Sequence, residues 1–237
     1  MALVRRPLVP IAFDALPLRC RETIESLSDR LAHMPRLRVE DVRIAPECCF
    51  ERLWHPLSDA YVERNPQRPD LHRSETERAT LAWLEADGRF SATVSAPAFR
   101  QSLKAANARL TNGRSDWRRG PMGLSADRSG IRIRLPGPQH IPAQLAKIHA
   151  LWVNDSNAPP VFGAVVTLAL IVNCHPFTDG NGRLARLLMN AWLRRGGMPA
   201  DVYIPFAEII RRSRGGYEIA LRMAEIQGNW DALADFI

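Results

Sequence analysis

The feature that most constrains the fold is a short polar run held between two apolar segments of helical length. Residues 161–172 are almost wholly apolar, which is typical of a buried helix. Pro176 disfavours helical dihedral angles at His175, so we expect this helix to end there, at a reversal of the chain. Apolar residues at helical spacing predict a second, amphipathic helix, with one face formed by Leu184, Leu187, Leu188, Ala191 and Trp192. Two glycines at 196 and 197 end it.

The polar run, residues 175–186, combines groups that would bind a nucleotide phosphate. Gly180 and Gly182 have no side chains, so the backbone N–H groups around them can turn toward an anion. The run also opens a helix N-terminus, where free amides and the helix dipole favour phosphate. Arg183 and Arg186 are three residues apart and can reach along one side of the first turn toward that phosphate.

Two further residues of the run supply a metal ligand and a base. Asp179 places a hard oxygen beside the predicted phosphate site, as Mg²⁺ requires when water and phosphate are its other ligands. His175 is able to take a proton near neutral pH. A Gly-Asn-Gly run is commonly just a turn, and a His-Pro pair just a loop. That reading leaves unexplained why all these groups occur within twelve residues, so the sequence predicts a nucleotide-transfer site.

The run resembles the Fic motif, His-Pro-Phe-x-Asp/Glu-Gly-Asn-Gly/Lys-Arg-x-x-Arg, and matches it at every defined position. The resemblance implies a protein adenylyltransferase, which transfers AMP from MgATP to a Ser, Thr or Tyr hydroxyl of a target protein and releases pyrophosphate. ATP and Mg²⁺ are then the expected cofactors, and a protein with an acceptor hydroxyl is the expected partner.

The resemblance also implies a role for each motif residue. His175 would deprotonate the incoming hydroxyl, Phe177 would anchor the loop in the core, and Asp179 would hold Mg²⁺ between the α- and β-phosphates. The remaining positions would bind phosphate: an anion hole of Gly180, Asn181 and Gly182, and β- and γ-phosphate ligands Arg183 and Arg186. The Doc branch, which phosphorylates its target, has lysine where this chain has Gly182, so glycine favours nucleotidyl transfer.

A candidate target-binding element precedes the motif. Ile131, Arg132, Ile133 and Arg134 alternate apolar and basic residues between glycine and proline turn signals, which predicts a short strand in a hairpin. The resemblance implies that this hairpin is the flap that binds a target peptide by strand addition beside the base. An exposed strand edge suits such binding, because backbone hydrogen bonds demand no single sequence. An ordinary surface hairpin is the alternative.

A candidate inhibitory residue lies in a helix predicted at 74–86, where Ser74 and Glu77 have the spacing of a capping box. Many Fic proteins carry Ser/Thr-x-x-x-Glu-Gly/Asn on a helix in this place, and its glutamate pairs with the second motif arginine and blocks productive ATP binding. Glu85 falls at the glutamate position, but the flanking positions of that motif differ. The hypothesis is that Glu85 lies near Arg186 and restrains activity. The alternative is a solvated residue at a helix end.

The fold class that follows is mainly α, a Fic-type helical bundle with a small β-hairpin flap. The proline-rich residues 1–70 are predicted to be an N-terminal extension of unknown role, because 65–69 read as a linker. The Fic domain would occupy residues 71–237, with core helices and motif at about 96–237. Other helices are expected at 21–33, 51–64, 96–110, 141–153, 205–212 and 217–227, with a short one after Asn229.

Composition narrows the class of protein. The 237 residues are 46% hydrophobic, enough for a large core, and no apolar run approaches the roughly 20 residues that span a bilayer. Residues 1–20 lack the pattern of a signal peptide, so a cytoplasmic location and no membrane partner are expected. The four cysteines show no metal-type spacing, and Cys174 is expected to be a small buried side chain rather than a nucleophile paired with His175.

Several alternatives to AMP transfer stay open. Within the family, the donor could be another nucleotide, or the reaction could be removal of AMP from a modified protein. Regulation could come from autoinhibition or from a separate antitoxin-type protein. A non-enzymatic ATP-binding or partner-binding module is a further alternative. The net charge of +7 raises nucleic-acid binding, but the arginines are scattered and aromatics make up only 7% of residues, so nucleic acid is not the expected partner.

Overall fold

The computed structural model describes residues 2–33, 48–65, 74–91, 93–113, 115–126, 128, 130–154 and 158–236. It confirms a mainly helical fold. The helices are α1 (Leu18–Ala32), α2 (Cys48–Glu51), α3 (Ser58–Arg64), α4 (Glu75–Ala86), α5 (Ala96–Leu110), α6 (Ile141–Asn154), α7 (Pro160–Cys174), α8 (Asn181–Arg195), α9 (Phe206–Arg212), α10 (Gly216–Gln227) and α11 (Asp231–Phe236). Short 3₁₀ turns are η1 (Phe13–Ala15) and η3 (Pro138–His140), and the two strands are β1 (Ala2–Val4) and β2 (Arg132–Arg134). No helix in the described ranges has the length and apolar character needed to cross a bilayer.

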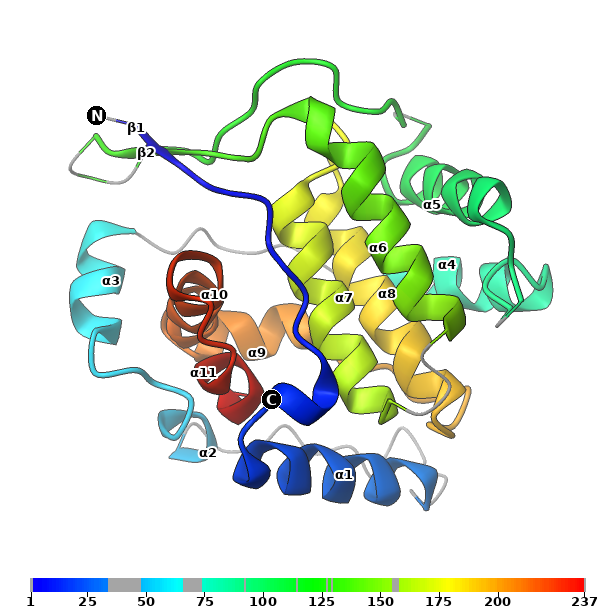
Figure 1. Ribbon diagram of the computed structural model, residues 1–237, viewed down its shortest axis with the longest axis horizontal. Coiled ribbons are helices and arrows are strands. Elements are labelled where there is room, and N and C mark those ends of the chain that lie inside the picture. Colours follow the sequence, from blue (N-terminus) through cyan, green and yellow to red (C-terminus); the bar gives the residue numbers. More distant parts are fainter. Residues whose placement is uncertain are drawn as a thin grey trace.

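The centre of the molecule is the pair of helices α7 and α8, which lie side by side (Figure 1). Nearly every side chain of α7 is buried, and α8 buries the face that its periodicity predicts. Gly163 lets the two helices approach closely, because a Cβ there would lie 2.6 Å from the Trp192 ring. The Trp192 indole N–H donates to the Thr167 hydroxyl at 2.8 Å, which satisfies both polar groups inside the apolar contact.

The other helices cover this pair on several sides. Helices α4 and α5 pack against α8, whereas α1 and α6 pack against α7, and α10 pairs with α11. The core is one continuous cluster that includes Leu8 and Ile24 near the N-terminus, Phe99 in α5 and Leu233 in α11. Each such side chain contributes about 1.5–3 kcal/mol by its burial. The packing fixes the polar turn between α7 and α8 against its neighbours.

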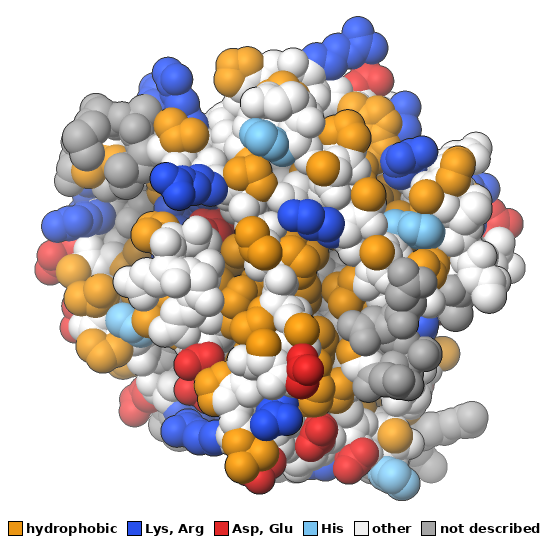
Figure 2. Space-filling model, viewed as in Figure 1, with side chains coloured by type: hydrophobic (Ala, Val, Ile, Leu, Met, Phe, Trp, Pro, Cys, Tyr) orange, Lys and Arg blue, Asp and Glu red, His pale blue; other side chains and the backbone are white. Residues whose placement is uncertain are grey.

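The N-terminal segment takes part in the same core. It runs from β1 down across α7 to α1 (Figure 1), and hydrophobic side chains gather along its course on that face (Figure 2). Leu8 and Leu16 of this segment are buried, as is Cys20 in α1. The boundary expected near residue 70 and most of the linker expected at 65–69 lie outside the described residues.

The hairpin expected at 131–134 is present, and a further strand that the sequence does not indicate pairs with it. Residues 122–124 lie antiparallel to β2, with Leu124 N donating to Ile133 O at 2.8 Å and Leu135 N to Met122 O at 2.9 Å. On the opposite edge of β2, β1 pairs in parallel, so that Leu3 is opposite Ile133. The parallel strand β1 was not expected.

Candidate active site

His175 lies at the C-terminal cap of α7, in the left-handed region with φ 50°. Its backbone N–H donates to Ile171 O at 2.9 Å, and its Nδ1 lies 3.1 Å from Val172 O. Because a carbonyl oxygen only accepts, Nδ1 carries the proton and Nε2 keeps a lone pair for a substrate. Burial lowers the pKa of His175 below its ordinary value, so the ring is neutral near pH 7 and able to act as a base.

The carbonyl groups around this cap are held by Arg118, for which the sequence predicts no role. Its guanidinium is buried and donates to His175 O at 2.9 Å, Cys174 O at 3.1 Å and Pro136 O at 2.7 Å. The last carbonyls of a helix lack intrahelical partners, and Arg118 supplies them here. Because Pro136 follows β2 closely, the same side chain joins the turn between α7 and α8 to the hairpin. A lone arginine in a polar loop gives no sequence signal for this role.

Phe177 and Asn181 fix the shape of the turn. The Phe177 ring is fully buried and stacks on Trp117, with ring centroids 4.5 Å apart. The Asn181 side chain accepts from Phe177 N and donates to Phe177 O, both at 2.9 Å. The position of Phe177 matches the anchoring role that the resemblance implies. The Asn181 side chain is used within the turn, so this residue has only its backbone N–H to offer an anion.

Gly180 and the start of α8 form the candidate phosphate site. Gly180 has φ 80°, and a Cβ there would lie 2.5 Å from Asn107 Oδ1 and 2.6 Å from Thr111 Cγ2. Only glycine therefore fits this conformation and this space. The first N–H groups of α8, from Asn181 to Arg183, have no acceptor within the helix, because the first intrahelical bond runs from Leu184 N to Gly180 O. They suit an anion.

Asp179 lies at the mouth of this site, with its side chain 71% exposed. One carboxylate oxygen accepts from Gly180 N at 2.6 Å, and the other lies 3.2 Å from Arg183 Nη2. Arg183 also donates to Leu110 O. A single exposed carboxylate beside an anion nest fits Mg²⁺, which takes one or two carboxylates and fills its other positions with phosphate and water.

Arg186 is held by a carboxylate that the sequence assigned to helix capping. Arg186 Nη2 lies 2.6 Å from Glu77 Oε1, and Glu77 is 1% exposed. The Tyr203 hydroxyl donates to Glu77 Oε2 at 2.6 Å, and burial raises the pKa of Tyr203. Ser74 makes no side-chain capping bond, so the predicted capping box is wrong.

The pairing expected between Glu85 and Arg186 is also wrong. Glu85 instead pairs with Arg194, which follows Arg186 by eight residues in α8. Glu85 follows Glu77 by eight residues, which is about 12 Å of helix. The sequence predicted correctly that the glutamate paired with Arg186 lies in α4. It did not predict the displacement of α4 along α8, which decides which glutamate that is. The signal that was available is Glu77 itself, a charged residue beside the apolar residues of α4.

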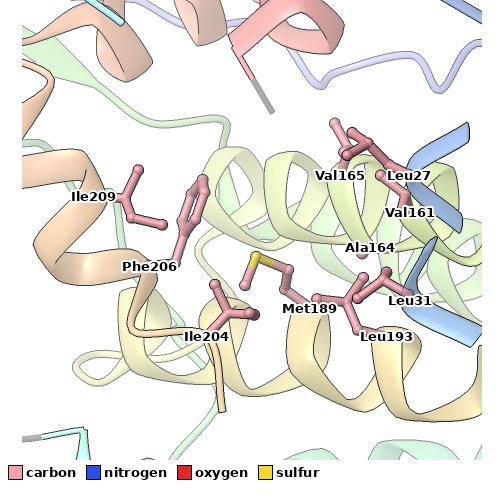
Figure 3. Close-up of a pocket in the computed structure, with 10 residues that line it drawn as sticks. All are labelled: Leu27, Leu31, Val161, Ala164, Val165, Met189, Leu193, Ile204, Phe206 and Ile209. Carbon is pink, nitrogen blue, oxygen red and sulfur yellow. The ribbon is translucent and has the colours of Figure 1, made fainter. Parts of the chain in front are cut away.

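A separate cavity of about 200 Å³ lies between α1, α7, α8 and α9 (Figure 3). Its lining is hydrophobic and includes Leu27, Val165, Met189 and Phe206. It offers no group that would bind phosphate, and none of its lining residues belongs to the turn. We therefore take the junction of α7 and α8 as the candidate nucleotide site.

Comparison with known sequences agrees with this location. Residues 99–193 match the model of the Fic/DOC family. Over 92 residues the chain is 36% identical to protein adenylyltransferase fic-1 of Caenorhabditis briggsae and 39% identical to protein adenylyltransferase Fic of Drosophila ananassae. In both cases the match covers 38% of this chain and 17% of the relative.

Comparison with solved structures extends the likeness to the whole fold. A Fic family protein from Desulfovibrio desulfuricans G20 is similar with a TM-score of 0.59 and 19% identity, over 98% of this chain and 72% of that one. Fic-1 of Caenorhabditis elegans gives a TM-score of 0.54 and 19% identity, over 92% of this chain and 67% of that one. At these identities the likeness shows the fold alone.

Proposed function

We propose that this chain, which is a Fic domain protein, transfers AMP from MgATP to a Ser, Thr or Tyr hydroxyl of a target protein. The observation that carries the proposal is the position of His175, a neutral base with Nε2 free, at the rim of the anion site formed by Gly180 and the start of α8. The adenylyltransferase names of the sequence relatives support it.

The chemistry requires one bond to form and one to break. The acceptor hydroxyl oxygen bonds to the α-phosphorus, its proton passes to His175 Nε2, and pyrophosphate leaves. The backbone N–H groups at 181–183 stabilise the negative charge that develops on the phosphate oxygens. Mg²⁺ held by Asp179 would neutralise charge between the phosphates. Arg118 acts through His175 by holding the turn that carries the base.

The position of Arg186 implies that this arrangement is restrained. Arg186 is expected to bind the terminal phosphates, but its guanidinium is paired with the buried Glu77. ATP must therefore displace a carboxylate to gain that arginine. We assign to Glu77 the inhibitory role that the sequence suggested for Glu85.

The same pair favours a second candidate function, the removal of AMP from a modified protein. A carboxylate held beside the phosphate site is a group that could orient water for hydrolysis. Glu77 is held in position for this role, because Tyr203 and Arg186 each contact one of its carboxylate oxygens. A donor other than ATP is also open, because the turn would contact the phosphates and not the nucleobase of the donor.

Intact mass spectrometry tests these possibilities together. The purified protein and lysate proteins are incubated with Mg²⁺ and each of the four nucleoside triphosphates, and His175→Ala, Glu77→Gln and Glu85→Gln are run beside the wild type. We expect one added AMP, lost in His175→Ala and increased in Glu77→Gln, with Glu85→Gln as the matched control on the same helix. Loss of AMP from premodified lysate protein would favour the second function. No change with any donor would leave a binding module or a nucleic-acid-binding protein.

A further inference from the structure

The edge of β2 on which a target strand would add is occupied by the chain itself. Strand β1 pairs with it in parallel over three residues, with Ala2 opposite Arg132 and Val4 opposite Arg134. Arg5 continues the pairing, because its N–H donates to Arg134 O at 2.8 Å. Figure 1 shows β1 next to β2, away from the central helices.

The residues after β1 are anchored beside the catalytic turn. Arg5 Nη1 lies 3.0 Å from Glu225 Oε1, and both side chains are almost completely buried. Leu8 N donates to Asn173 Oδ1 at 2.9 Å, and the Asn173 amide donates to Arg6 O at 3.1 Å. Asn173 is two residues before His175. The N-terminal strap, residues 2–8, therefore runs from the hairpin edge to the end of α7.

The two ends of the strap differ in how they are held. Leu8 is 3% exposed and belongs to the core, whereas Val4 is 67% exposed. The outer part, β1, is held by main-chain hydrogen bonds to one strand. A short strand of this kind can detach while the inner anchor stays in place, because local opening of such a segment breaks only a few main-chain hydrogen bonds.

The strap carries no group that could accept a nucleotide. Residues 1–22 contain no serine, threonine or tyrosine, and the first hydroxyl side chain of the chain is that of Thr23, in α1. Strand β1 is therefore an extended peptide without an acceptor. It fills the binding edge and cannot be modified by the proposed reaction.

The strap also leaves the arginines of β2 without acidic neighbours on β1. Arg132 and Arg134 are exposed, and alanine and valine are their partners across the parallel pair. Both line an open groove of about 590 Å³, together with Met122 and Leu124 of the antiparallel segment. A segment with acidic residues two apart would place a carboxylate opposite each arginine, which favours cross-strand pairing.

We propose that β1 is an intramolecular pseudosubstrate, and that a target binds by replacing it with an extended acidic segment that carries a hydroxyl. The role of that hydroxyl rests on the proposed function, whereas the exchange of strands does not. A tethered strand competes at an effective concentration on the order of millimolar, so free segments are excluded until β1 detaches.

Peptide binding tests the exchange without any transfer reaction. A variant lacking residues 1–4 removes β1 and keeps Arg5 and Leu8. Two fluorescein-labelled decapeptides, identical apart from a central Ala-Leu-Val or Glu-Leu-Asp, are titrated by anisotropy into this variant and the full chain. We expect the truncation to tighten binding by at least about tenfold and the acidic peptide to bind roughly threefold to tenfold tighter than the other. Equal affinity for the full chain and the truncated variant would overturn the proposal.

A reversible lock guards against an effect of truncation on folding. Leu3→Cys combined with Ile133→Cys places two thiols on directly opposed residues, and oxidation would hold β1 on β2. We expect the oxidised protein to bind neither peptide and the reduced protein to regain the affinity of the full chain. Binding by the oxidised protein at the level of the truncated variant would contradict exchange at this edge.

Mass spectrometry then separates this proposal from the proposed function. Serine is placed in turn at residues 2, 3 and 4, and each variant is incubated with ATP and Mg²⁺. We expect at least one serine to gain AMP, its oxygen bonding to the α-phosphorus as pyrophosphate leaves, and His175→Ala to abolish the gain. If lysate proteins are modified but no such serine is, β1 is not a pseudosubstrate. If the peptides exchange but nothing is modified, the strand site stands and the proposed transfer fails.

Discussion

Helices α4 and α8 are joined at two places by the same kind of ion pair, and the two pairs differ mainly in burial. Glu77 pairs with Arg186, and eight residues further along both helices Glu85 pairs with Arg194. The Glu77 side chain is 2% exposed, whereas that of Glu85 is 36% exposed. Glu77 also accepts from the Tyr203 hydroxyl, whereas in the described part of the chain no hydroxyl donates to Glu85.

The position of a glutamate along α4 therefore decides whether its ion pair is buried and can hold the arginine in place. Water competes for Glu85, so its pair contributes about 0–1 kcal/mol. Glu77 is removed from water, and its partners must satisfy it. The buried pair therefore keeps Arg186 in one place, which suits a restraint on phosphate binding. The Glu85–Arg194 pair only joins the C-terminal ends of α4 and α8.

The largest expected effect is on stability. Glu77→Ala leaves the Arg186 guanidinium and the Tyr203 hydroxyl without their partner, and we expect it to lower the free energy of unfolding by about 3–5 kcal/mol. Glu85→Ala should lower it by less than about 1 kcal/mol. Urea unfolding followed by circular dichroism measures both. Equal losses would show that burial does not distinguish the pairs.

Tyr203→Phe probes the third partner alone. The change keeps the ring and removes an O–H that donates to a buried carboxylate, so we expect a loss of about 1.5–3 kcal/mol in the free energy of unfolding. In a Glu77→Gln background the loss should shrink, because the acceptor is no longer a carboxylate. A double-mutant cycle from urea unfolding gives the coupling. A loss that is the same in both backgrounds would assign the effect to packing.

A smaller difference between the Glu77–Arg186 and Glu85–Arg194 pairs is expected in the affinity for ATP. Glu77→Gln weakens the hold on Arg186, and we expect ATP with Mg²⁺ to bind roughly tenfold tighter. Glu85→Gln, two helical turns away, should bind ATP as the wild type does. Isothermal titration calorimetry measures both. Tighter binding in Glu85→Gln alone would restore the earlier assignment of the inhibitory residue.

The smallest effect is expected on the pH dependence of transfer. Burial lowers the pKa of His175, so the neutral base persists to a lower pH and kcat/KM falls only as the pH drops through that lowered value, below about 6.5. Besides burial, the groups that shift the pKa of His175 are the Val172 carbonyl, Arg118, Arg5 and Asp179, and Glu77 is not among them. The acid limb should therefore coincide in wild type, Glu77→Gln and Glu85→Gln. An acid limb that moves in Glu77→Gln alone would show that the Glu77–Arg186 pair is coupled to the protonation of His175.

The sequence predicted those parts of the molecule that follow from local pattern. The apolar stretch 161–172 and the periodicity after Leu184 gave α7 and α8, and Pro176 with the glycines gave the turn between them. His175, Asp179 and Gly180 accordingly lie together at that turn. These features depend on residues that are neighbours in the chain.

What the sequence did not predict depends on contacts between distant residues. The register of α4 along α8 is set by packing, so reasoning along one helix chose Glu85 over Glu77. Strand β1 has only three residues and pairs with residues about 130 positions away, which leaves no periodic signal. Arg118 is identified only by the carbonyls that it reaches.

The guanidinium of Arg118 has a consequence for how an acceptor would be chosen. It donates both to the carbonyl of His175 and to that of Pro136, just after β2, so one side chain joins the proposed base to the proposed peptide-binding edge. An extended segment on that edge advances about 3.3 Å per residue past a base that stays still. If the proposed transfer and strand exchange both hold, the residue modified would be the one at a fixed number of residues from the paired strand, whatever its neighbours are.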